Sequence, residues 1–168
     1  LEDGLSVLDE MRSDGVKMIT LTWNGHNCIG SGNDTREGLS SFGIKALKRM
    51  EELHIVADVS HLNDAGFRDV LSHATRPFVA THSNSRSVCA HPRNLTDYER
   101  FNQGSGKGLG QPDVTFDELS YHIDHFLELG GEHVIALGSD FDGSTTPSWL
   151  SGAQDMPAFH ALVARRFG

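Results

Sequence analysis

The sequence predicts an α/β fold built around a parallel sheet. Short apolar runs typical of strands alternate along the chain with segments of helical periodicity, which is the pattern of consecutive βα units. The strand-like runs are almost entirely apolar, as expected when helices cover both faces of a sheet. In such folds, whether the sheet is open or closed into a barrel, functional side chains gather at the carboxyl ends of the strands. We therefore examine those ends for chemistry.

The first third of the chain predicts two strands separated by a loop and a helix. Leucine and methionine at helical spacing predict a helix over residues 1–15, which Gly15 ends. A strand is expected over 16–22, followed by a polar, glycine-rich loop over 23–41. A helix over 42–53 and a short buried strand over 55–59 complete this part.

The middle of the chain predicts a capped helix, a third strand and a long loop. Asn63 is a candidate N-cap for a helix that runs to Ala74. Residues 78–81 predict a short strand, and residues 82–112 predict a loop that contains a possible short helix over 96–101.

The last third predicts two helices and a fourth strand. Thr115 and Glu118 form the pattern of a capping box, and two glycines at 130 and 131 end that helix. Residues 133–138 predict the fourth strand, and a final helix is expected over 156–167.

Composition excludes several classes of protein. The length of 168 residues corresponds to about one domain, and the net charge of -9, from 23 acidic and 14 basic residues, argues against a nucleic-acid-binding surface. No run approaches the roughly 18 apolar residues of a membrane span. Cys28 and Cys89 are too few for a disulfide scaffold and form no CxxC pattern.

Three potential ligands follow predicted strands. His61 follows the strand at 55–59, His82 follows the strand at 78–81, and Asp140 follows the strand at 133–138. Imidazole and carboxylate are ligands that zinc accepts, and residues on neighbouring strand ends converge without being close in sequence. Each side chain is alternatively an ordinary polar residue at the start of a loop.

Two further features have both a functional and a plain interpretation. Arg93, in the sequence HPRN, offers a forked cationic donor to a substrate carboxylate or phosphate, or else pairs with a surface acid. His122 and His125 form an H-x-x-H pattern, which lacks the spacing and the glutamate of the zinc motif H-E-x-x-H. We expect both histidines on the exposed side of their helix.

Several blocks of sequence, taken in order, resemble the membrane (renal) dipeptidase family. They are ITLTWN, NCIG, GLSSFGIKALKRMEELHIVADVSH, FVATHSNSRSVCAHPRNLTD and HVIALGSDFDG, and they extend over about residues 5 to 160. The LTWN variant is similar to the bacterial branch. The resemblance implies a zinc metallodipeptidase on a (β/α)8 TIM barrel, with residues 1–168 as part of that single domain. Because such a barrel needs about 250 residues, the barrel here is expected to be incomplete.

The resemblance also implies roles for individual residues. His61 and His82 match the two histidines that hold the second of two zinc ions, and Arg93 matches the arginine that binds the carboxylate of the dipeptide. Asp140 matches the aspartate that handles the proton of a metal-activated water. The two metal ions would polarise the peptide carbonyl and activate the attacking water, and Asp140 would pass a proton to the leaving amine.

The sequence departs from the family pattern in several places. The His-x-Asp pair of the first zinc site is expected before Leu1, and Glu2 falls several residues too late to be the bridging glutamate. Trp23 stands where the family often has a substrate-binding histidine, which leaves His26 as a candidate substrate contact. We expect these residues to come from a longer protein; a naturally truncated or divergent homologue is the alternative.

The expected function is metal-dependent hydrolysis of dipeptides with two zinc ions in the complete protein. The alternatives are another barrel metallohydrolase, acting on a phosphoester or a cyclic amide, and a non-catalytic remnant of the dipeptidase family. A small peptide is the expected partner, with no nucleic acid or membrane, and a homodimer is plausible from the family. Two free cysteines and the similarity to the bacterial branch favour the cytoplasm.

Overall fold

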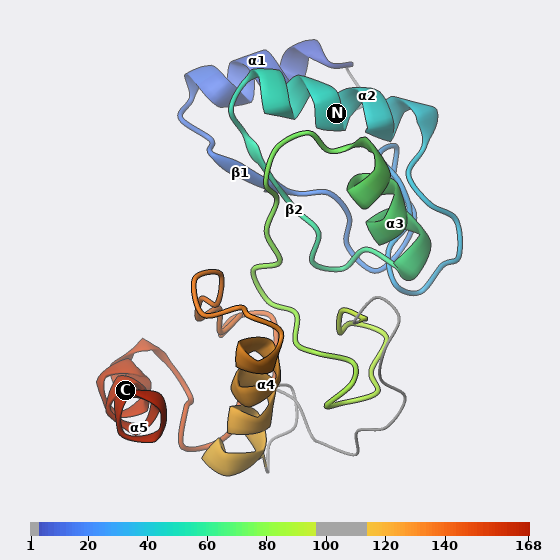
Figure 1. Cartoon of the computed structure of the whole chain (residues 1–168). Coiled ribbons are helices and arrows are strands. Elements are labelled where there is room, and N and C mark those ends of the chain that lie inside the picture. Colours follow the sequence, from blue (N-terminus) through green and yellow to red (C-terminus); the bar gives the residue numbers. More distant parts are fainter. Residues whose placement is uncertain (1–3, 97–113) are drawn as a thin grey trace. The chain divides into compact units, whose positions relative to one another are not determined.

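The computed structural model describes residues 4–96 and 114–168, which form two compact units that divide after Ser83 (Figure 1). The expected short helix at 96–101 lies outside the described residues except for its first residue. None of the helices in the described ranges combines the length and the hydropathy that a membrane span requires.

The first unit alternates helices and strands as the sequence predicts. Its elements are α1 (Ser6–Ser13), β1 (Met18–Thr20), α2 (Ser41–Glu52), β2 (Val56–Asp58) and α3 (Asp64–His73). Helices α1 and α3 and both strands lie inside the ranges expected for them and are shorter at their ends, whereas α2 begins and ends one residue before the expected range of 42–53.

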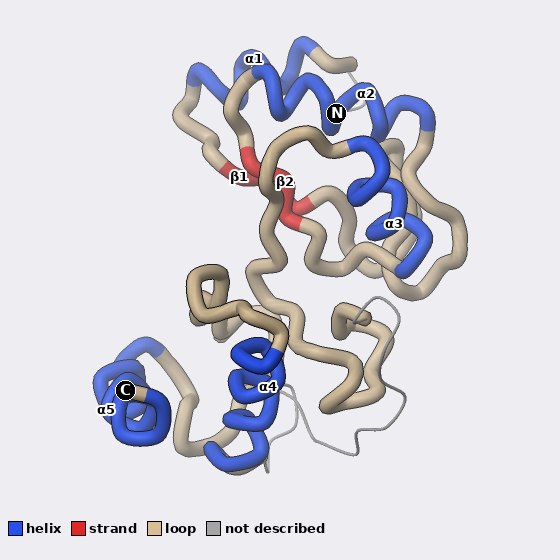
Figure 2. The backbone as a smooth tube through the Cα atoms, in the orientation of Figure 1, coloured by secondary structure: helices blue, strands red, loops and turns tan. Residues whose placement is uncertain are grey.

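The sheet of this unit is a parallel pair of strands, which confirms the predicted α/β class. β1 pairs with β2 in a register that places Thr20 opposite Asp58. The helix α2 connects the two strands, so β1, α2 and β2 form one βαβ unit. Figure 2 shows these two strands as the only ones among the described residues.

The expected third strand at 78–81 is reduced to one parallel bridge between Asp58 and Val79. The Val59 N–H donates to the Val79 carbonyl at 2.8 Å, and the Val79 N–H donates to the Ala57 carbonyl at 3.0 Å. The prediction of a full strand is wrong, although its direction and its neighbour are those of a third parallel strand.

The core of the first unit fills the space between the sheet and its helices. Leu8 from α1, Leu47 and Met50 from α2 and Val70 from α3 are each at most 1% exposed. Helices α1 and α2 lie side by side (Figure 1), and an ion pair between Arg49 and Asp9 joins them. Burial of these apolar side chains holds the helices against the strands.

The second unit contains α4 (Phe116–Glu128), the short helix η1 (Ala153–Asp155) and α5 (Met156–Phe167). The capping box of Thr115 and Glu118 is present at the start of α4, as predicted. Leu119, Leu150 and Phe159 form its buried apolar cluster.

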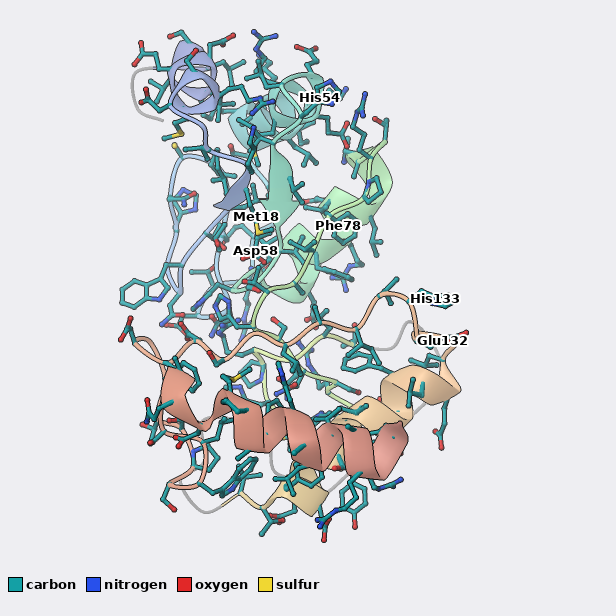
Figure 3. The ribbon with its side chains drawn as sticks, turned by 90° about the vertical axis from the view of Figure 1, so that its left-hand side faces the viewer. Met18, His54, Asp58, Phe78, Glu132 and His133 are labelled. Atoms are coloured by element: carbon teal, nitrogen blue, oxygen red, sulfur yellow. The ribbon has the colours of Figure 1, made fainter. Side chains whose placement is uncertain are left out.

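Two sequence predictions for this unit are wrong. Residues 133–138 do not form a strand: the N–H groups of Val134 and Ile135 both donate to the Gly131 carbonyl in a turn after α4. An apolar run becomes a strand only with a partner to complete its ladder, and Val134 is 83% exposed. Figure 3 shows His133 on this segment, beyond the end of α4.

His122 is also not on the surface of its helix. It is 1% exposed, and its Nδ1 accepts a hydrogen bond from the Ser85 N–H at 3.3 Å. The contact comes from a segment 37 residues away in sequence, which local helical periodicity does not reveal.

Candidate metal site and substrate-binding residues

His61 and His82 lie together at the carboxyl end of the sheet in the first unit. His61 follows β2 by three residues, and His82 follows the bridging residue Val79 by three. Their ring centroids are 4.9 Å apart and the rings meet edge to face at 62°. Parallel strand ends thus bring together two imidazoles that are 21 residues apart in sequence.

The backbone and the ring of His61 are both constrained. Its φ is +73°, in the left-handed region that a non-glycine residue adopts at a cost of roughly 1–2 kcal/mol. Its Nδ1 is 2.9 Å from the side-chain oxygen of Asn24, which lies in the loop after β1. Because an amide oxygen only accepts hydrogen bonds, this nitrogen carries the proton, and the lone pair of the neutral ring is on Nε2.

Asp58 is the centre of the hydrogen-bond network at this end of the sheet. Its side chain is 1% exposed, and Figure 3 shows it where β2 ends. The hydroxyl groups of Thr20 and Thr81 donate to its Oδ2 at 2.8 and 2.6 Å. The backbone N–H groups of Ser60 and Thr81 donate to its Oδ1 at 3.0 and 3.1 Å.

These contacts determine the charge of Asp58. Burial by itself raises the pKa of a carboxyl group, but the hydrogen bonds from Thr81 and Ser60 outweigh it, so the pKa of Asp58 is lowered below its ordinary value. The side chain is therefore an ionised carboxylate at neutral pH and only accepts hydrogen bonds.

His82 is connected to this carboxylate through its neighbour in the chain. The Nδ1 of His82 is 2.7 Å from the hydroxyl oxygen of Thr81. Its backbone N–H donates to the hydroxyl of the buried Ser60 at 3.2 Å. Both the ring and the backbone of His82 are thus held by residues that also contact Asp58.

His26 lies in the same loop as Asn24, on an exposed stretch. Its Nδ1 is 3.1 Å from the hydroxyl of the fully buried Ser31. Trp23, which begins this loop, is 74% exposed. The loop therefore presents two exposed ring side chains that follow β1.

Arg93 belongs to the second unit, where it lies in a tightly folded loop. Asn94 is 8% exposed; its side chain accepts from the Asn84 N–H at 3.2 Å and donates to the Cys89 carbonyl at 3.0 Å. The guanidinium of Arg86 donates to the Asn94 carbonyl at 2.9 Å. This network holds the backbone on either side of Arg93, which is half-buried.

Asp140 also belongs to the second unit. Its carboxylate is exposed, and a turn follows it over residues 141–143. Its φ is +50°, and its carbonyl accepts from the N–H groups of Gly143 and Ser144, each at 3.0 Å. A Cβ at Gly143 would lie 2.5 Å from the Asp140 Oδ1, so a larger residue there would require this exposed carboxylate to turn away.

The candidate residues thus form two sets, with His26, His61 and His82 in the first unit and Arg93 and Asp140 in the second. Residues 4–96 and 114–168 contain no group of three or more histidine, cysteine, aspartate or glutamate side chains able to hold a metal ion. The paired imidazoles suit zinc in chemistry, but they supply only two of the four ligands that zinc usually takes.

Sequence reasoning missed three residues that support the histidines, namely Asn24, Asp58 and Thr81. The signal for Asp58 is a charged residue inside the otherwise apolar run IVADV, with hydroxyl residues at the ends of the neighbouring strands. A buried carboxylate requires donors, and Thr20 and Thr81 are in position to supply them.

Comparison with known proteins places the chain among metallopeptidases. The family model described as membrane dipeptidase (peptidase family M19) matches residues 1–168. A Klebsiella pneumoniae protein from the pqqA 5' region is 38% identical over 166 residues, covering 85% of this chain and 61% of that protein. The dipeptidase verJ of Clonostachys rogersoniana is 31% identical over 164 residues, covering 89% of this chain and 42% of that protein.

A solved structure matches as well. The metallopeptidase of Rhodobacter sphaeroides, solved with a phosphinate mimic of the dipeptide L-Ala-D-Ala, superposes with a TM-score of 0.85 at 29% identity. The match covers 96% of this chain and 53% of that one. The chain therefore spans about half the length of the relatives it matches.

Proposed function

Because the chain belongs to the membrane dipeptidase family, peptidase family M19, we propose that it forms part of a zinc-dependent dipeptidase with a (β/α)8 barrel. The observation that supports this function best is the His61–His82 pair, with ring centroids 4.9 Å apart, at the carboxyl end of the sheet. This is the edge at which enzymes with parallel sheets place their active sites.

His61 and His82 are the residues that would hold zinc. The Nδ1 of each ring contacts an oxygen of the protein, and Nε2 is the atom through which each ring would bind the metal. Zinc supplies Lewis-acid polarisation of a carbonyl and activation of water in such a site. The further ligands would come from other parts of the complete protein.

The other candidate residues would bind and protonate the substrate. Arg93 would pair its guanidinium with the C-terminal carboxylate of a dipeptide, and His26 would add a hydrogen bond. In hydrolysis the hydroxyl of water joins the carbonyl carbon while the bond to the amide nitrogen breaks. Asp140 would take the proton that the water loses and pass it to the leaving amine.

The substrate class follows from the carboxylate-binding role of Arg93 and from the related protein. The Rhodobacter sphaeroides metallopeptidase was solved with a mimic of L-Ala-D-Ala, and L-Ala-D-Ala is therefore the first substrate to test. A D-residue at its C-terminus would be tolerated if binding depends mainly on the carboxylate.

The test is hydrolysis of a small panel of dipeptides by the complete protein of which this chain forms part, with and without a metal chelator. We expect L-Ala-D-Ala to be cleaved, activity to be lost with the chelator, and activity to return when zinc is added. His61→Ala and His82→Ala should each abolish hydrolysis, whereas the exposed His160→Ala should retain it.

Three results would contradict the proposal. Cleavage that is insensitive to the chelator would exclude the metal mechanism. Hydrolysis of a phosphoester or a cyclic amide in place of the dipeptides would favour another barrel metallohydrolase. An absence of both activity and bound metal would favour a non-catalytic remnant of the family.

A further inference from the structure

A continuous chain of short hydrogen bonds runs from the buried carboxylate of Asp58 to the ring of His82. The hydroxyl oxygen of Thr81 is 2.6 Å from the Asp58 Oδ2 and 2.7 Å from the His82 Nδ1. A single hydroxyl group therefore contacts a carboxylate on one side and an imidazole on the other. The position of its one proton decides which nitrogen of His82 is protonated.

The proton of Thr81 lies toward Asp58. An ionised carboxylate only accepts, and without that proton two oxygen atoms would face each other at 2.6 Å with nothing between them. The oxygen of Thr81, having donated its proton, accepts from the other side. The Nδ1 of His82 must then carry a hydrogen and donate it.

We propose that Asp58, acting through the Thr81 hydroxyl, holds His82 in the tautomer that is protonated on Nδ1 and so directs the Nε2 lone pair toward the metal. Asp58 and Thr81 are positioning residues in this arrangement, since neither is required to touch metal or substrate. The inference rests on the proposed function in that it assigns the exposed lone pair to zinc.

The neighbouring histidine has the same protonation by a different route. His61 donates its Nδ1 hydrogen to the side-chain oxygen of Asn24, 2.9 Å away. The acceptor for His61 is an amide oxygen, and the acceptor for His82 is a hydroxyl that itself donates to a carboxylate. In both rings the hydrogen is therefore on Nδ1 and the lone pair is on Nε2. The orientation of a ligating imidazole depends on such outer hydrogen bonds.

Three substitutions separate this role from a general contribution to folding. Thr81→Val removes the hydroxyl that relays the hydrogen bond and keeps the shape of the side chain. Thr81→Ser retains the hydroxyl. Thr20→Val is the matched control, because Thr20 donates to the same Asp58 oxygen at 2.8 Å without taking part in the hydrogen-bond path to His82.

The first measurement is the tautomer of His82 in the full chain after removal of metal, read from two-bond ¹H–¹⁵N correlations of the imidazole. The His82 signals are identified by their loss in His82→Ala. We expect the wild type, Thr81→Ser and Thr20→Val to show the hydrogen on Nδ1. Thr81→Val should lose this preference and show a mixture with the other tautomer.

The second measurement is zinc affinity, determined by competition with a chelator of known affinity. Thr81→Val should weaken zinc binding by about 10–100-fold, as is usual when the outer partner of a ligand is removed. Thr81→Ser and Thr20→Val should retain the affinity of the wild type, even though Thr20→Val also removes a hydrogen bond to Asp58.

Three outcomes would overturn the inference. The first is a wild-type protein that carries the hydrogen of His82 on Nε2, which is tested without any variant. The second is a folded Thr81→Val protein that keeps the hydrogen on Nδ1. Equal loss of zinc affinity in Thr20→Val and Thr81→Val would reduce the network to a structural role. Failure to cleave dipeptides, with the tautomers as expected, would count only against the proposed function.

Discussion

Individual residues at the carboxyl end of the sheet combine a buried charge with an unusual backbone conformation. Asp58 is an ionised carboxylate with 1% exposure, and its four donors compensate the loss of water. His61 adopts positive φ, as do His54 before β2 and Asp140 in the second unit. Backbone conformations of this kind persist only where surrounding contacts enforce them, and they concentrate at functional sites.

Replacing Asp58 with asparagine should destabilise the protein. The NH2 group of the asparagine would face hydroxyl or N–H donors that now donate to a carboxylate oxygen. Those buried donors would lose their acceptor, and each unsatisfied group costs about 1–3 kcal/mol. Urea unfolding measures this loss in the free energy of unfolding. Asp14→Asn, which removes an exposed carboxylate from the same unit, should have little effect.

The same variant should change how stability depends on pH. The pKa of Asp58 is lowered in the folded protein, so the unfolded chain binds more protons as the pH falls past the ordinary pKa of an aspartate. Its stabilising contribution is complete above that unfolded value and is lost as the pH falls through the folded pKa. Asp58→Asn should therefore lose less stability than the wild type on acidification, and an unchanged slope would contradict this assignment.

Arg93→Ala tests the carboxylate contact. We expect kcat/KM for L-Ala-D-Ala to fall by about 10–100-fold, the equivalent of one charged hydrogen bond, while the C-terminal amide of the same peptide is cleaved as before. Arg165→Ala removes the same charge from the exposed end of α5 and should change neither rate. Equal losses for both peptides would argue against carboxylate recognition.

The loop between β1 and α2 is the element that completes the histidine pair. It carries Asn24, and it is tied to the start of α3, where the Asn63 side chain donates to the Glu37 carbonyl at 2.8 Å. Gly32 lies so close to the preceding turn that a Cβ there would overlap the Trp23 carbonyl oxygen. The path of the loop therefore depends on this glycine.

Gly32→Ala should displace the Trp23–Asn24 backbone and with it the acceptor of the His61 ring. We expect the free energy of unfolding to fall by about 1–3 kcal/mol, as at other overpacked sites, and zinc binding to weaken. Gly25→Ala is the matched control, because a Cβ there meets no atom within 4 Å. Chemical unfolding and zinc competition on the two variants measure the difference, and equal behaviour would show that the loop adapts.

At the scale of the whole molecule, the chain corresponds to only part of its relatives. It covers 61% and 42% of the two curated relatives described above and 53% of the Rhodobacter sphaeroides chain. Within the described residues two histidines converge, whereas zinc usually takes four ligands. We therefore expect tight binding of metal in the complete protein.

Metal removal should lower the stability of the protein. A ligand that binds only the folded state stabilises it by about 2.7 kcal/mol at a concentration one hundred times its dissociation constant. We expect zinc to raise the Tm and a chelator to reverse the increase. The double variant His61→Ala/His82→Ala should not respond to either treatment, and His160→Ala should respond like the wild type. A zinc response that persists in the double variant would place the metal elsewhere.

Much of the fold is predictable from local sequence. Alternating apolar periods predict α1 to α3 and both strands, and the caps at Asn63 and Thr115 are where side-chain chemistry places them. The candidate ligands are also visible, because a polar residue directly after an apolar run marks a strand end. Each of these patterns involves residues close together in the sequence, so it can be recognised without knowledge of the tertiary fold.

Only the tertiary structure decides which distant residues meet. It places His61 beside His82, surrounds Asp58 with donors from two other segments, buries His122 against Ser85 and leaves residues 133–138 without a strand partner. Local sequence is enough to predict the order of the elements in the first unit and the types of ligand that follow its strands. Strand pairing and the burial of polar groups depend on contacts across tens of residues, and no local pattern records them.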